Sequence, residues 1–121
     1  MAVGPKTLRI YQTSTGRKPF QEWLDSLDDK MRGRILTRLG RVRLGNLGDS
    51  KAVANGVCEL RVNAGPGYRI YFGQDGESII LLLCGGDKAT QRKDIAYAKK
   101  YWKGYGSRKD AKKRSIRRLL D

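Results

Sequence analysis

The 121 residues suit one domain of ordinary size with a single hydrophobic core. Lys and Arg number 26 against 12 Asp and Glu, so the formal net charge is +14 and nucleic acid is the leading class of partner. Two cysteines without any histidine exclude a zinc site, and we expect neither a metal nor another cofactor. We find no apolar signal segment, and the longest apolar run, residues 79–84, is too short to span a membrane, so we expect a cytoplasmic protein.

The N-terminal part of the chain predicts one strand and two helices. Residues 7–11 (TLRIY) alternate and are rich in β-formers, which indicates a strand. Pro19 fits the first turn of a helix that continues to Leu27 with apolar residues at helical spacing. Asp28 and Asp29 are typical caps of a second helix, over about residues 30–44. The expected inner face of this second helix consists of Ile35, Leu39 and Val42.

A section with period 2 follows and predicts three further strands. Residues 57–62 (VCELRV) and 68–72 (YRIYF) alternate, and the five residues 63–67 between them form a hairpin loop of ordinary length. After a tight turn, residues 78–84 (SIILLLC) are apolar throughout, which indicates a central strand buried on both faces.

Gly85 and Gly86 are expected to end that strand, and residues 87–105 then predict a third helix. Its packing stripe would consist of Ile95, Ala98, Trp102 and Tyr105. Residues 107–121 carry seven Lys and Arg against two Asp, which favours a mobile basic tail that becomes helical when bound.

Together these elements predict an α+β fold with the order β-α-α-β-β-β-α. A mostly antiparallel, four-stranded sheet would pack against helices. Residues 1–106 would form the domain and residues 107–121 a basic C-terminal tail.

The second helix carries the first candidate RNA-binding feature. Six basic residues occur in it without an acidic residue between them, and Arg34, Arg38 and Arg41 lie at i, i+4 and i+7 on one stripe. Like charges at this spacing repel each other by a few tenths of a kcal/mol, roughly, and an anionic partner would offset that cost. The alternative is a solvated helix face that binds nothing.

The predicted hairpin carries the second feature. If the apolar residues of its two strands face the helices, Arg61, Arg69 and Tyr71 project together from the opposite, open face of the sheet. Arginine matches phosphate oxygens with a rigid fork, and a base stacked on tyrosine contributes about 1–3 kcal/mol. The alternative is an ion pair of Glu59 with Arg61 or Arg69, which explains one arginine better than both.

The loop GGDKATQRKD, residues 85–94, carries the third feature. The two glycines would let the backbone approach a ligand closely, and the N-terminus of the next helix would offer free N–H groups to an anion. Lys88, Arg92 and Lys93 add positive charge there. An ordinary strand-to-helix turn is the alternative.

Four segments of this sequence resemble a known protein superfamily. They are FQEWLDSL (20–27), GNLGDSK (45–51), ELRVNAGPGYRIYF (59–72) and LLLCGGDKATQRKDIAYAKKYW (81–102). Together they resemble the RelE/ParE toxins, and most closely the phage Gp49-like, HigB-type "addiction module killer" branch. The resemblance covers roughly residues 7–105 and leaves out the tail.

The resemblance implies a RelE-like fold and the toxin of a type II toxin–antitoxin system. Such toxins are usually endoribonucleases that cut mRNA on the ribosome, inhibit translation and are neutralised by a helix-turn-helix antitoxin. Arg69 matches an arginine that contacts the scissile phosphate, and Lys88 lies near the position of another basic active-site residue. Arg61, Tyr71 and Gln91 belong to motifs of this branch.

The missing histidine is a departure from some relatives and excludes a histidine pair as general acid and base. Our hypothesis is a metal-independent reaction in which Arg61 and Arg69 stabilise the charge that develops on phosphorus. Lys88 would be the general base or the leaving-group acid, and Tyr71 would stack on a base.

Two other functions fit the same sequence. A ParE-like toxin would act on DNA gyrase by protein contact, without nuclease activity. A non-catalytic nucleic-acid-binding module would use the same arginines to contact phosphates. Arg61, Arg69 and Lys88 on one predicted face favour the nuclease.

Overall fold

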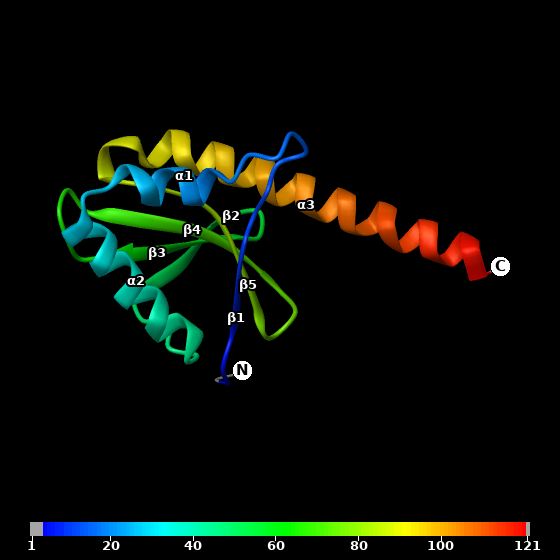
Figure 1. Cartoon of the computed structure of the whole chain (residues 1–121), viewed down its shortest axis with the longest axis horizontal. Helices are drawn as coiled ribbons and strands as arrows, with labels where there is room; N and C mark the ends of the chain where they lie inside the picture. The colour runs from blue at the N-terminus through cyan, green and yellow to red at the C-terminus, as the bar shows by residue number, and fades with distance from the viewer. Residues whose placement is uncertain (1–3, 121) are drawn as a thin grey trace.

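A five-stranded sheet forms the centre of the computed structural model, which describes residues 4–120 (Figure 1). The strands are β1 (Thr7–Ile10), β2 (Ser50–Ala54), β3 (Val57–Val62), β4 (Tyr68–Asp75) and β5 (Ile79–Gly86). Their order across the sheet is β1-β5-β4-β3-β2, with β1 parallel to β5 and the other neighbours antiparallel. The α+β class is confirmed, but the prediction of four strands is wrong.

The additional strand is β2, which pairs with β3 through a two-residue turn. Asn55 and Gly56 both adopt positive φ angles, 34° and 84°, as this type of hairpin requires. Asn-Gly is among the strongest sequence signals for a hairpin, so the strand could have been found. Its own residues, SKAVA, include lysine and alanine, which are depleted in strands, and this explains why strand propensity alone missed it.

Helices cover both faces of the sheet. They are α1 (Pro19–Ser26), α2 (Asp29–Arg43), a 3-10 turn η1 (Lys88–Thr90) and α3 (Gln91–Leu120). The predicted inner faces of α1 and α2 are confirmed: Phe20, Leu24, Ile35, Leu39 and Val42 are buried with apolar residues of β3, β4 and β5.

The opposite face of the sheet packs against α3, through the predicted stripe of Ile95, Ala98 and Trp102. Residues 80–84 of β5 contribute to both cores, as expected of a central strand. The sheet therefore has no open face beneath α3, contrary to the sequence prediction, and this decides the environment of the hairpin residues described below.

Helix α3 continues far beyond the predicted end at Tyr105. Lys109 pairs with Asp75 at 2.5 Å, and Arg108 donates to the carbonyl of Gln12 at 2.7 Å, so the helix is attached to the domain up to this point. Residues 111–120 are all exposed, and Figure 1 shows this end of α3 projecting away from the sheet. We call residues 110–120 the C-terminal arm. It is a continuation of a packed helix and not a separate coil, because alanine, lysine, arginine and leucine are good helix formers.

Candidate nucleic-acid interface

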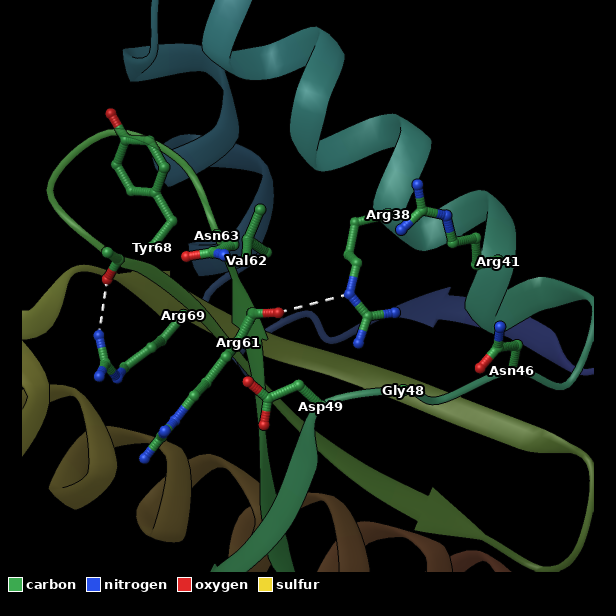
Figure 2. A pocket seen from close by; sticks show the side chains of 11 residues that line it. Arg38, Arg41, Asn46, Gly48, Asp49, Arg61, Val62, Asn63, Tyr68 and Arg69 are labelled. Carbon is green, nitrogen blue, oxygen red and sulfur yellow. Dashed lines mark hydrogen bonds between the residues drawn. The ribbon is translucent and has the colours of Figure 1, made fainter.

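A basic hollow of about 470 Å³ lies between α2, the loop before β2 and the hairpin of β3 and β4 (Figure 2). Four arginines and one carboxylate line it, together with polar side chains. They are Arg38, Arg41, Arg61, Arg69 and Asp49, with Asn46, Asn63 and Tyr68. We call it the arginine hollow. Two of the arginines come from α2 and two from the hairpin, so the tertiary fold brings together what the sequence presented as two separate features.

Arg61 and Arg69 are direct neighbours on adjacent strands. They are paired in the antiparallel register of β3 and β4, and Figure 2 shows their side chains extending in the same direction. Two like charges placed opposite each other repel, so the pair requires a compensating anion. Glu59 provides it: its Oε1 lies 3.5 Å from Nε of Arg61 and 3.6 Å from Nε of Arg69.

Glu59 therefore pairs with both arginines, whereas the sequence analysis gave an ion pair only as the alternative to a nucleotide site, and for one arginine rather than both. The two pairs differ in exposure, because the side chain of Arg61 is 43% exposed and that of Arg69 only 11%. Arg69 also donates from Nη1 to the carbonyl of Gly67 at 2.7 Å, while its buried Nε has no hydrogen-bond partner. Arg61 can reach solvent, whereas Arg69 is held in place.

Glu59 itself is fully buried and accepts two further hydrogen bonds. Tyr71 Oη donates to Oε2 at 3.1 Å, and Gln91 Nε2 donates to the same oxygen at 2.7 Å. Burial pushes the pKa of Glu59 upward, but the bonds from Gln91 and Tyr71 and the charge of Arg69 outweigh it, so the pKa lies below the usual value. Glu59 is thus an ionised carboxylate that orients the two arginines and is not a proton acceptor.

Two residues predicted to contact RNA belong to this buried network instead. Tyr71 is 0% exposed, so the prediction that it stacks on a base is wrong for this structure. Burial and the carboxylate of Glu59 raise the pKa of Tyr71, which keeps its hydroxyl protonated as a donor. Gln91 has its side-chain amide on Glu59 rather than on a ligand. Tyr71 is buried because helix α3 covers the face of the sheet that the sequence analysis had taken as open.

Lys88 and Arg69 both lie next to Gly67 of the hairpin loop. A Cβ placed on Gly67 would lie 3.2 Å from Nη1 of Arg69 and 3.7 Å from Cβ of Lys88. Gly67 has a φ of +81°, and glycine is favoured there for that reason as well. The structure therefore brings Arg61, Arg69 and Lys88 to one region, with Lys88 exposed.

The three arginines of the stripe on α2 differ in exposure, because Arg38 is buried and hydrogen-bonds to backbone carbonyls. Its guanidinium donates to the carbonyl of Leu47 and, at 3.4 Å, to that of Arg61. Burial, followed by the charge of Arg41, lowers the pKa of Arg38. Arg38 joins the loop before β2 to the end of β3, so its predicted role in RNA binding is corrected to a mainly structural one.

Arg34 and Arg41 remain exposed. Both line a second hollow of about 450 Å³ along α2, next to the arginine hollow, and Arg41 lines both. The outer part of the stripe therefore extends the basic surface.

The predicted glycine loop is filled by the protein. Cβ atoms on Gly85 and Gly86 would overlap the indole of Trp23 and the carboxylate of Asp94. Both glycines still belong to β5, and they allow close packing rather than approach of a ligand.

Nor is the helix N-terminus after this loop free. Asp87 accepts from the backbone N–H groups of Ala89 and Thr90, at 2.8 and 3.2 Å. The prediction of an anion site at these N–H groups is therefore wrong. Arg92 and Lys93 are exposed, but neither lines the arginine hollow.

Comparison with known proteins identifies the family. The profile of the family described as phage derived protein Gp49-like matches residues 22–103. A Haemophilus influenzae protein, described as uncharacterized, is 43% identical over 94 residues, which cover 77% of this chain and 91% of that protein. The chain belongs to the Gp49-like family. This is a family of RelE-like toxins, and membership implies an antitoxin as partner.

The region matched by the Gp49-like profile contains the arginine hollow, Glu59 and Lys88, but not the C-terminal arm.

Within residues 4–120, no helix combines the length and apolar composition needed to cross a membrane. In the same range, no three side chains of the types that bind metal ions come together as a site.

Proposed function

We propose that this member of the Gp49-like family is the toxin of a type II toxin–antitoxin system and inhibits translation by cutting mRNA on the ribosome. The observation that carries the proposal is the pair Arg61 and Arg69, oriented by the buried Glu59 at the arginine hollow with Lys88 beside it. Preorganised cations of this kind stabilise charge as it develops on a phosphoryl group. The proposal places the protein in the cytoplasm, where its substrate is found.

The reaction needs no metal ion in this proposal. The ribose 2′-oxygen attacks phosphorus in line, the bond from phosphorus to the 5′-oxygen breaks, and the products are a 2′,3′-cyclic phosphate and a 5′-hydroxyl. Arg69 contacts the non-bridging oxygens, and Arg61 joins it because it is half exposed and can move onto the phosphate.

Two proton transfers complete the reaction without histidine. The proposal assigns Lys88 to protonate the leaving 5′-oxygen, since this exposed lysine and Arg69 both lie next to Gly67 and an ammonium group can donate a proton. The proton of the 2′-hydroxyl requires an acceptor. Glu59 already accepts hydrogen bonds from Arg61, Tyr71 and Gln91 and pairs with Arg69. Asp49 is the carboxylate that lines the arginine hollow, so the proposal assigns this role to Asp49.

The antitoxin follows from the same charges. A helix-turn-helix antitoxin, encoded beside the toxin, would neutralise it by covering the arginine hollow with an acidic segment. Such a contact would make the association rate and the affinity depend steeply on ionic strength.

The test is cleavage of mRNA on purified ribosomes, with mapping of the new 5′ ends. Wild-type protein should give cuts at the ribosomal A site with 5′-hydroxyl ends, and Arg69→Ala should reduce the rate by about 100-fold or more, as removal of one oriented donor does. Arg9→Ala is the matched control, because it removes one exposed arginine from β1, at the other edge of the sheet, and should leave the rate unchanged. Growth arrest without cleaved mRNA, with gyrase inhibited, would instead establish the ParE-like alternative.

A further inference from the structure

Three tyrosines form a stacked ladder between the β1–α1 loop and α3, outside the arginine hollow. The rings of Tyr11 and Tyr101 are 5.2 Å apart at 30°, and those of Tyr101 and Tyr97 are 6.0 Å apart at 24°. At one end the guanidinium of Arg108 lies 5.2 Å from the centre of the Tyr11 ring. At the other end Tyr97 is 48% exposed. The ladder thus ends in an aromatic ring supported from behind and open to solvent.

A hollow of about 530 Å³ lies along this ladder, and its charged lining is entirely basic. The lining includes the three tyrosines, the hydroxyls of Thr13, Ser14 and Ser107, and the cations Arg17, Lys100 and Lys103. We call it the tyrosine hollow. A second hollow of about 410 Å³, which Tyr97 also lines, contains Glu22 and Asp94, and these acidic side chains make it less suitable for a polyanion.

Packing alone does not account for this arrangement. Tyr11 is buried and Tyr101 is partly buried, so their stacking belongs to the core beneath α3. Tyr97 adds little to that core, because about half of its surface is exposed, and Lys100 and Lys103 line the same hollow as its ring. An exposed ring among cations is the combination used for single-stranded nucleic acid, in which every base offers a stacking face and every nucleotide a negative charge.

We infer that the tyrosine hollow binds single-stranded nucleic acid, with one base stacked on Tyr97 and the adjoining phosphates held by Lys100 and Lys103. The hydroxyls of the β1–α1 loop lie where they can contact the sugar or the edge of the base. The tyrosine hollow and the arginine hollow share no residue, so this inference does not depend on the proposed nuclease activity. If both are correct, the tyrosine hollow holds a part of the strand that is not cut.

The test is fluorescence anisotropy with a fluorescein-labelled, single-stranded RNA of eight uridines at 0.15 M salt. Tyr97→Ala should weaken binding by about tenfold, as expected for the loss of one base–aromatic stack, and Tyr97→Phe should bind like the wild type. Tyr97→Leu, which keeps an apolar side chain but has no aromatic face, should resemble Tyr97→Ala. Because Tyr97 is half exposed on a helix, all three variants should keep the wild-type Tm.

An abasic oligomer with the same number of phosphates separates stacking from general attraction to a +14 protein. Wild type and Tyr97→Ala should bind this oligomer equally. Equal binding of the uridine oligomer by both proteins would overturn the inference, and so would an equal loss on both oligomers. Cleavage by Tyr97→Ala in the ribosome assay is a separate readout, so failure of this site and failure of the nuclease can be told apart. A matching DNA oligomer then shows whether the site prefers RNA.

Discussion

Replacement of Glu59 by glutamine tests the central claim about the arginine hollow, that one buried carboxylate holds two arginines in place. Glutamine has nearly the same size and can still accept a hydrogen bond from Tyr71, so the change removes little except the charge. Arg69 then stays buried without a counter-charge, whereas Arg61 can turn into solvent. Removing one partner of a buried ion pair leaves the other charge buried and uncompensated, which destabilises a protein by about 3–5 kcal/mol. Since Arg61 is nearly half exposed, its pair adds little to this figure.

We therefore expect Glu59→Gln to lower the free energy of unfolding by about 3 kcal/mol, the lower end of that range. For a domain of this size, this corresponds to a fall in Tm of roughly 10 °C. The measurement is urea unfolding followed by the fluorescence of Trp23 and Trp102, which lie on opposite faces of the sheet. Glu22→Gln is the control, because it removes an exposed carboxylate that also pairs with an arginine, Arg17, and it should have a much smaller effect.

The effect of this substitution should also depend on pH in one direction. Because the folded protein holds the pKa of Glu59 below its unfolded value, ionised Glu59 stabilises the fold at pH values above about 4.3, the usual pKa of glutamate. This stabilisation is lost as the pH falls through the lower, folded pKa. The stability difference between wild type and Glu59→Gln should thus be constant near neutral pH and shrink below about pH 4. A loss no larger than that of Glu22→Gln, or one independent of pH, would refute the role given to Glu59.

Two further predictions concern the basic elements around the site. Arg38→Ala should destabilise the protein by about 2 kcal/mol in the same urea assay, since it removes charged hydrogen bonds to the carbonyls of Leu47 and Arg61. Arg34→Ala, on the exposed side of α2, is the control and should leave the stability unchanged. Equal effects of the two substitutions would contradict the structural role of Arg38. Deletion of residues 111–121 should leave the Tm within about 2 °C of wild type, because residues 111–120 are exposed. The deletion should also make the affinity for RNA less sensitive to salt concentration. An unchanged salt dependence would exclude a phosphate-binding role for the C-terminal arm.

Local patterns were sufficient for most elements of the fold. Helical spacing identified the buried faces of α1 and α2, and the alternation of residues 57–62 and 68–72 gave the two strands of the hairpin, with the correct residues on each face. These features depend on the periodicity of the backbone itself, 3.6 residues in a helix and 2 in a strand. Strand β2 lacked strong β-formers, and only its Asn-Gly turn marked it.

The candidate site could be predicted only in part. The sequence placed Arg61, Arg69 and Tyr71 on a common face, because side-chain direction follows from the strand period. It could not show that α3 covers Tyr71, since that depends on which face of the sheet a distant helix packs against. Glu59 was missed as the organising residue for the same reason: an alternating strand offers an acidic side chain, but only burial turns it into a counter-charge for two arginines.

The sequence by itself determined the charge of this protein, its helical and strand periodicity, and the motifs by which it resembles the RelE-like toxins. The tertiary structure decided which of the basic residues are available. It buried Arg38 against backbone carbonyls, held Arg69 beside Glu59 in the lining of the arginine hollow, and left Arg41 and nearly half of Arg61 exposed there. It also brought Tyr97 and the lysines of α3 beside the β1–α1 loop. Charge and periodicity are local properties of a chain, whereas burial depends on contacts between segments far apart in it.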